Sequence, residues 1–195
     1  MMLTQKMESY IFKLAKKGNR KAFGDLIDMY KDSAFTLVHQ LMNDPIEAEK
    51  IVIRTFLLLH SQLNNLPVEA KPSTVIYQFC IKLCMEKIKS EGKLEKVQEN
   101  QLPLPEITLN IDMPDLKSKL AHSIHGMPII HKTVVILKYV MNLSLAEISD
   151  ILQVNTQNAK TYLRDGREYL SLQLSYQLIQ NERINKFDEC LQLGF

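Results

Sequence analysis

The sequence predicts an all-α fold made of two small helical domains joined by a flexible linker. Three observations support this fold class. Apolar residues recur at steps of three and four along most of the chain, which is typical of amphipathic helices. No stretch shows the alternating pattern of a β-strand. A stretch rich in charges and prolines, residues 93–113, interrupts the periodicity, and we interpret it as the linker.

The composition fits a globular protein of low net charge. The chain has 195 residues, of which 46% are hydrophobic and 24% charged. The net charge of +2 does not by itself indicate a polyanionic partner, so any contact with nucleic acid must come from local clustering. No run of about eighteen apolar residues and no signal-peptide core is found, so we expect no membrane insertion and a cytoplasmic location.

Three cysteines, Cys80, Cys84 and Cys190, are too few and too unevenly spaced for a disulfide framework. Cys80 and Cys84 are one helical turn apart, and no His or third Cys lies at ligand spacing near them. We predict buried structural thiols rather than a metal site. No cofactor is expected.

Residues 1–92 are predicted to form the first domain. Asp44 and Pro45 give a strong helix-start signal, because an aspartate caps the free amides and proline fits the first turn. A turn at Gly18 and Asn19 ends a shorter first helix. The four expected helices begin near residues 5, 22, 45 and 73.

Residues 114–178 are predicted to form the second domain, followed by a tail, 179–195, to which we assign no role. Ser144 and Glu147 have the spacing of a capping box, which opens a short helix. Residues 153–155 form a turn, and Thr156 begins a last long helix. Two helices joined by such a turn indicate a helix-turn-helix. The preceding helix, over residues 129–139, is expected to bury Val134, Val135, Leu137 and Val140.

The last helix has two distinct faces. Ala159, Leu163, Gly166 and Leu170 are expected to face the core, and the opposite stripe consists of Gln157, Lys160, Thr161 and Arg164. Gln and Arg can pair with base edges in a major groove, and Lys and Thr can hold phosphates. Spacing alone leaves two interpretations open, a DNA-binding helix and an ordinary solvated face.

The segments 127–152 and 155–170 resemble region four of the extracytoplasmic-function (ECF) sigma factors of the sigma-70 family, with Lys160-Thr161, Leu163 and Gly166-Arg167-Glu168 at matching places. In that family the domain docks on a flap of RNA polymerase and reads the minus-35 promoter element with the last helix. The resemblance implies a DNA-binding set of Asn155, Thr156, Gln157, Asn158, Lys160, Thr161, Arg164 and Arg167.

The N-terminal half resembles region two of the same family, through residues 17–23, 44–49 and Thr55-Phe56. In the family this domain grips the polymerase clamp and opens the minus-10 element. The implied clamp face consists of Glu47, Lys50, Ile53, Arg54 and Leu57, and the implied minus-10 residues are Tyr77, Lys82, Glu86 and Lys89.

Region two departs from the family pattern at several of these positions. Lys50, Ile53 and Arg54 replace residues that are usually acidic or polar and that meet basic clamp helices, so we expect a weaker electrostatic interface. Val75 stands where the family usually has Trp, and the chain contains no Trp. We therefore expect few stacking contacts with an unpaired base.

The leading hypothesis is an ECF sigma factor that binds core RNA polymerase and promoter DNA and acts in the cytoplasm at the nucleoid. Many relatives also have an anti-sigma partner that covers both domains. The alternative is a degenerate sigma-like regulator that binds DNA or polymerase but cannot open promoters alone. An enzyme is disfavoured, since no nucleophile–base pair, phosphate loop or metal-ligand spacing is found. The histidines are scattered at His39, His60, His122, His125 and His131.

Overall fold

The structure is a computed structural model of the chain, and it describes residues 2–67, 69–92 and 116–173. These residues are helices and short connections, with no strand among them, which confirms the all-α prediction. The predicted linker, 93–113, and the tail, 179–195, lie outside the described residues, as does Cys190. Among the described helices, none combines the length and the apolar character needed to cross a membrane.

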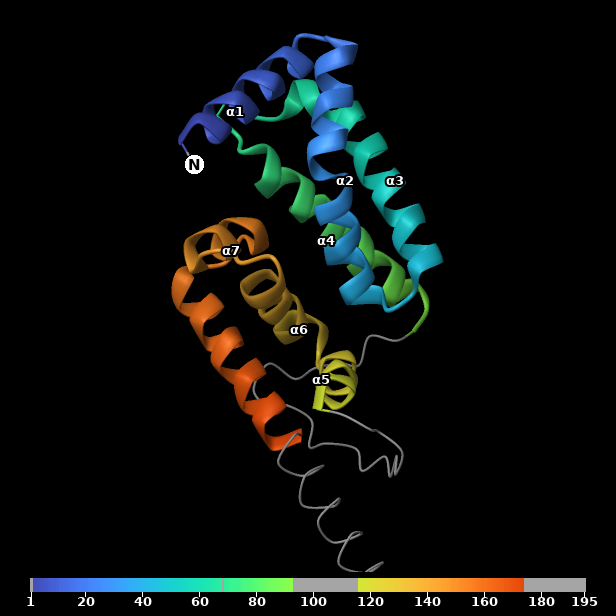
Figure 1. The fold of residues 1–195 in the computed structure, drawn as a ribbon, viewed down its shortest axis with the longest axis vertical. Coiled ribbons are helices and arrows are strands. Elements are labelled where there is room, and N and C mark those ends of the chain that lie inside the picture. Colours follow the sequence, from blue (N-terminus) through green and yellow to red (C-terminus); the bar gives the residue numbers. More distant parts are fainter. Residues whose placement is uncertain (1, 68, 93–115, 174–195) are drawn as a thin grey trace, which may run out of the picture.

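Four helices form the N-terminal domain, as expected (Figure 1). The start of α3 follows the predicted capping chemistry, because Asp44 accepts from the amides of Ile46 and Glu47. Asn19, which was predicted only to end the first helix, also caps the start of α2 by accepting from the amide of Ala22. The helix before Asp44 ends at Asn43, which has a left-handed φ of 54° and is of a residue type that tolerates it. The elements are α1 (Met2–Lys16), α2 (Arg20–Met42), α3 (Pro45–Gln62), the short 3₁₀ helix η1 (Leu63–Asn65) and α4 (Pro72–Ser90).

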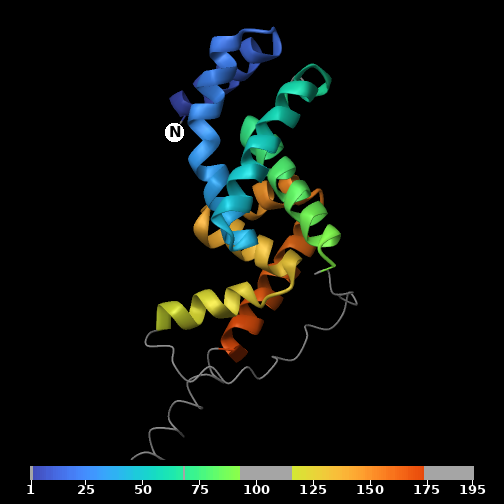
Figure 2. The same cartoon turned by 90° about the vertical axis from the view of Figure 1, so that its right-hand side faces the viewer.

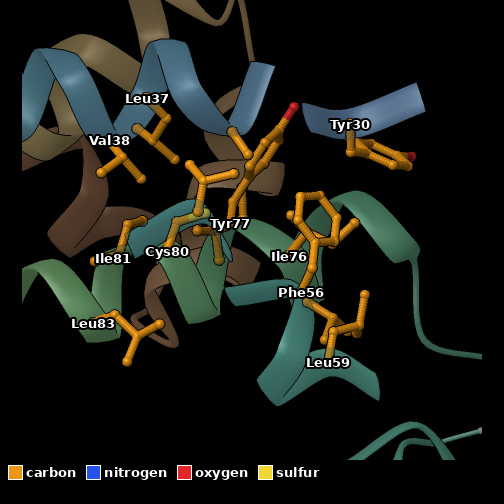
Figure 3. Close-up of a cluster of buried hydrophobic side chains, with 14 of the residues drawn as sticks. Tyr30, Leu37, Val38, Phe56, Leu59, Ile76, Tyr77, Cys80, Ile81 and Leu83 are labelled. Atoms are coloured by element: carbon orange, nitrogen blue, oxygen red, sulfur yellow. The ribbon is translucent and has the colours of Figure 1, made fainter. Parts of the chain in front are cut away.

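The core of this domain lies between α2, α3 and α4. Each large apolar side chain removed from water there contributes about 1.5–3 kcal/mol. The two predicted structural thiols, Cys80 and Cys84, are buried in this core and unpaired, and burial raises the pKa of Cys80 to about 12. Figure 3 shows side chains from the three helices converging, among them Tyr30, Leu37, Val38, Phe56, Leu59, Ile76, Tyr77, Cys80, Ile81 and Leu83.

The second half contains the expected helices, with one difference in the middle of the domain. Its elements are α5 (Leu116–His125), α6 (Ile129–Val135), the π-helical turn η2 (Ile136–Val140) and α7 (Leu145–Leu152), followed by a helix described over 156–173. The expectation that Val140 is buried is wrong, because its exposed fraction is 46%. The wider π turn rotates the residues after Leu137 away from the direction that a regular helix would give them.

The C-terminal helices pack directly against the first domain. Helix α7 contacts α4, while α6 and η2 contact α2, and Figures 1 and 2 show these helices side by side. The buried side chains of Val134, Ile136, Leu137, Ile148 and Ile151 form one continuous apolar cluster with those of the N-terminal helices. The two halves are therefore closed onto each other, which the sequence pattern did not predict.

Candidate nucleic-acid interface

The helix-turn-helix begins at the predicted capping box. The hydroxyl of Ser144 accepts from the amide of Glu147 at 3.3 Å, and the Glu147 carboxylate accepts from the Ser144 amide at 2.9 Å. These bonds to Ser144 lower the pKa of the Glu147 carboxyl. The cap fixes the entry angle of α7, the first helix of the motif.

The turn between the two helices has a left-handed residue and a side-chain cap. Gln153 has a φ of 55°, and its amide bonds to the carbonyl of Ser149, which ends α7. Asn155 Oδ1 accepts from the amide of Asn158 at 2.7 Å, so Asn155 caps the helix that begins at residue 156. Asn155 belongs to the predicted DNA-binding set, and its side-chain oxygen also caps this helix.

The inner face of the last helix packs closely on α6. Ala159 is fully buried, and a Cβ atom on Gly166 would lie 2.9 Å from Val135 Cγ2, so only glycine permits this approach. Near the end of the described helix, the Tyr169 hydroxyl donates to the carbonyl of Gly126 at 3.0 Å. These contacts fix the rotation of the helix about its axis. The predicted inner positions Ala159 and Gly166 are buried, and Leu163 and Leu170 are half-buried.

The rotation places the predicted stripe on the surface. Lys160, Arg164 and Arg167 follow each other at steps of four and three, and they line an open groove beside Leu145 of α7. A basic row along a helix that follows a helix-turn is suited to a nucleic-acid backbone. Of the residues predicted to bind DNA, only Thr161 is half-buried, and the exposed ones are Asn155, Thr156, Gln157, Asn158, Lys160, Arg164 and Arg167.

Sequence reasoning missed one acidic residue on this helix. The guanidinium of Arg164 bonds to the Asp165 carboxylate through Nε at 2.9 Å and Nη2 at 2.8 Å. The Arg164 side chain is 72% exposed, whereas that of Asp165 is 23% exposed. Adjacent helical residues do not normally face each other, so the spacing gave no signal for this pair.

A buried imidazole lies behind the last helix, residues 156–173. His131 of α6 is 8% exposed and contacts the ring of Tyr162, with 5.6 Å between ring centroids. Its Nδ1 has no hydrogen-bond partner within the described structure. Burial lowers the pKa of His131, and the nearby Asp165 carboxylate partly opposes this shift. The neutral ring is therefore favoured in the folded state.

The predicted minus-10 residues divide into two groups. Tyr77 is buried, contacts the ring of Tyr30 edge to face, and has its pKa raised by burial. Since a stacking platform needs an exposed ring, Tyr77 does not offer one. Lys82, Glu86 and Lys89 are exposed on one face of α4, at steps of four and three.

The predicted clamp face lies on α3, and most of it is exposed. Ile53 and Leu57 are 54% and 64% exposed, and Lys50 and Arg54 are exposed beside them. Ile46, which was not predicted, is 67% exposed and lies seven residues before Ile53, so it extends the same stripe. Spacing from Ile53 could have identified it.

The remaining predicted member of this face, Glu47, is engaged within the domain. Its carboxylate pairs with Lys50 at 3.4 Å and with Lys87 of α4 at 3.3 Å. The exposed surface of α3 carries Glu49 as well as apolar and basic side chains, and the half-buried Glu47 is already paired with two lysines. No cluster of potential metal ligands occurs in the part of the chain that the structure describes.

Together, the helical fold and the exposed basic row define a two-domain helical protein with a helix-turn-helix DNA-binding unit. Residues 118–170 match the family model for sigma-70, region 4. The ECF RNA polymerase sigma factor SigW of Bacillus subtilis (strain 168) is 28% identical over 175 residues, which cover 83% of this chain and 94% of SigW. The match to region 4 and the similarity to SigW both point to the ECF subfamily of the sigma-70 factors.

A solved structure agrees at the level of the fold. CnrH, in complex with the cytosolic domain of CnrY, superimposes with a TM-score of 0.67 at 13% sequence identity. The match covers 87% of this chain and 97% of CnrH. It extends over both halves of the chain.

Proposed function

We propose that this chain is an ECF sigma factor that binds core RNA polymerase and directs it to promoters. The observation that carries the proposal is the exposed row of Lys160, Arg164 and Arg167 on a helix whose rotation is fixed by Gly166. A major groove admits one helix, and this helix presents Gln157 and Arg164 for base edges and Lys160 for phosphate. The relative of known function, SigW, is similar over nearly its whole length.

The N-terminal domain, residues 1–92, supplies the polymerase contact in this proposal, and residues 114–178 supply the minus-35 contact. Ile46, Lys50, Ile53, Arg54 and Leu57 form the clamp face on α3. An apolar surface of this kind contributes by burial rather than by charge, so binding to polymerase depends less on salt than an acidic clamp face would. Lys82, Glu86 and Lys89 on α4 are the candidates for the minus-10 element.

One specific observation favours the alternative function, a degenerate sigma-like regulator. Val75 and Tyr77 are both buried, with exposed fractions of 5% and 6%. The usual aromatic platform for an unpaired base is therefore missing at these positions. A regulator of this class would bind DNA or polymerase without opening promoters unaided.

Initiation on linear DNA distinguishes the two functions. Purified chain, core polymerase and a linear duplex promoter should give a specific transcript, and Arg164→Ala should reduce its yield. The same promoter with a pre-melted minus-10 bubble should give more transcript than the duplex, because stacking contacts worth roughly 1–3 kcal/mol per base are scarce here. Transcript from the bubble alone would select the regulator. Absence of binding to both polymerase and promoter DNA would contradict both functions.

An anti-sigma partner and a location at the nucleoid complete the proposal. CnrH was solved with the cytosolic domain of CnrY, and we infer a partner of this general kind, encoded beside this chain, that covers both domains. Co-expression of such a neighbouring protein should abolish binding to core polymerase. Unchanged polymerase binding in its presence would exclude that neighbour as the partner.

A further inference from the structure

The first helix, α1, carries an exposed aromatic ring within a row of lysines. Tyr10 is 63% exposed. Three exposed lysines, Lys6, Lys13 and Lys17, are placed four residues before it, three after it and seven after it. At 3.6 residues per turn these spacings put the lysines on the same side of the helix as the ring. Lys17 follows the last residue of α1, but its amide still bonds to the Lys13 carbonyl at 3.3 Å, so it continues the row.

The charge around this row is positive and is not neutralised within the domain. Residues 9–24 contain five Lys or Arg side chains and no Asp or Glu, in a chain whose net charge is only +2. The one acid of α1, Glu8, faces the core instead, because burial and then the Glu8 carboxylate raise the pKa of Tyr30. Neither Lys13 nor Lys17 forms an ion pair with any residue that the structure describes. These cations are therefore free to bind an anionic partner.

The other aromatic rings of the N-terminal domain are covered. Phe35 is 37% exposed, but its ring is stacked on His39 with 5.7 Å between the ring centroids. Among residues 2–67 and 69–92, Tyr10 alone combines a largely exposed ring with cations on both sides. The remaining rings are buried or half-buried, namely Phe12, Phe23, Tyr30, Phe56, Tyr77 and Phe79.

The row lies apart from the two surfaces already assigned to DNA. Figures 1 and 2 both show α1 at the opposite end of the N-terminal domain from the end of α4. The exposed residues Lys82, Glu86 and Lys89 lie in the second half of α4. The helix over 156–173 belongs to the other half of the chain. The row on α1 is therefore a third surface.

An exposed ring between cations is suited to a single strand of nucleic acid. Unpaired bases have free π-faces that stack on an aromatic side chain, while the phosphates on either side bind the lysines. The bases of a duplex are already stacked on each other, so a duplex can use the charges but not the ring. A membrane surface requires a broad apolar face, and Met7 is the one large apolar side chain exposed beside Tyr10 on the described part of α1.

We propose that this Tyr10 row, which consists of Tyr10 with Lys6, Lys13 and Lys17, binds single-stranded DNA without sequence preference. Tyr10 stacks on one base, and the lysines hold the neighbouring phosphates. The binding goes beyond the proposed function and is testable on the chain alone, without polymerase. Its consequence, that the row holds one strand of an opened promoter, rests on the proposed function.

Fluorescence anisotropy with the full chain and a labelled oligothymidine of about 12 nucleotides tests the row, since single-strand sites span about 4–16 nucleotides. The wild type should bind this probe, and Tyr10→Ala should weaken binding about tenfold, within the range expected for one stacked base. Tyr10→Phe keeps the ring and should bind like the wild type. Lys13→Ala should lower the slope of log affinity against log salt by about 0.7 unit.

Tyr139→Ala is the matched control, because Tyr139 is 57% exposed on η2, outside the row. If Tyr10→Ala and Tyr139→Ala, both folded by circular dichroism, bind oligothymidine equally well, the proposal is wrong. A wild type that binds only oligouridine, only phosphatidylglycerol vesicles or neither would also overturn it.

Binding to a minus-35 duplex separates this proposal from the proposed function. Tyr10→Ala should leave the affinity for that duplex unchanged, because the duplex contact is assigned to the helix over 156–173. A wild type that binds oligothymidine through Tyr10 but binds no promoter duplex would contradict the proposed function and would support the single-strand site.

Discussion

The guanidinium of Arg164 is held against the carboxylate of Asp165, the next residue on the same exposed helix, with 2.8 Å between Nη2 and Oδ1. The side chain proposed to read a base is therefore already engaged in the free protein. Because an exposed ion pair is worth only about 0.2–1 kcal/mol, a guanine edge can replace Asp165 as the partner. The pair restrains Arg164 without preventing DNA recognition.

Arg164→Ala should weaken binding to the cognate minus-35 element by about 1–3 kcal/mol and relax the preference at one base position. Lys160→Ala is the comparison, since loss of a phosphate contact should weaken all sequences alike and reduce the salt slope by about one unit. Titrations on the cognate and a scrambled element at several salt concentrations separate the two effects. Unchanged affinity in both folded variants would mean that this helix does not bind DNA.

Asp165→Asn should strengthen DNA binding. The substitution releases Arg164 and removes a negative charge beside phosphates, and we expect a gain of up to about 1 kcal/mol. Fluorescence anisotropy with a labelled minus-35 duplex measures this change. Weaker binding in the variant would show instead that Asp165 orients Arg164 toward its base.

Gly166→Ala should destabilise the C-terminal half, although alanine is the better helix former. A Cβ at position 166 would lie 2.9 Å from Val135 Cγ2, and overpacking typically costs about 1–3 kcal/mol. Gly24 in α2 is the matched control, because a Cβ atom at that position would meet nothing within 4 Å. Gly24→Ala should therefore stabilise the protein by about 0.5–1 kcal/mol. Urea unfolding measures both, and a stabilising Gly166→Ala would contradict the close approach.

Acid should destabilise the chain through His131. Burial lowers its folded pKa, so below the ordinary value of about 6.5 the unfolded state binds a proton that the folded state resists. The free energy of unfolding should fall as the pH falls from about 7 to 5. His131→Gln should reduce this slope, measured by urea unfolding across that range. An equal slope in the variant would assign the acid sensitivity to other groups.

Reversing two charges on α3 should tighten binding to a typical core polymerase. Lys50→Asp with Arg54→Glu restores acidic residues opposite basic clamp helices, each worth on the order of 1 kcal/mol. Lys13→Asp with Lys17→Glu, at two exposed positions on and just after α1, is the control, because it changes the net charge by the same amount. If the double variant loses binding to the polymerase of its own cell, that polymerase has adapted to a basic and apolar face.

Local signals in the sequence predicted the local structure well. The caps at Asp44 and Ser144 depend on side chains within three residues of the amides they satisfy, so spacing is enough to find them. The inner position of Gly166 followed from periodicity in the same way. The π turn was not predictable, because a single extra residue per turn changes no residue type, and Val140 was placed inside for that reason.

The relations between distant residues were not predictable from periodicity. Lys132 reads as an ordinary polar position, and only the fold brings its Nζ to the backbone carbonyl of Leu41, 91 residues earlier in the chain, to which it donates at 2.9 Å. Tyr77 reads equally well as core or platform, and packing against Tyr30 decides between them. The periodicity of apolar residues shows which residues share a face of one helix. A site between helices depends on how those faces pack against each other, which periodicity does not show.

The two partners of the Leu41–Lys132 hydrogen bond respond differently to amino-acid substitution. The acceptor is a main-chain carbonyl, which every residue type provides, whereas the donor exists only while the codon at position 132 encodes a long cationic side chain. Substitutions at the end of α2 therefore leave the acceptor, the backbone carbonyl at position 41, in place. A chimera that joins this C-terminal half to the N-terminal half of a relative should therefore keep the hydrogen bond from Lys132, provided that the helix equivalent to α2 ends at the same position.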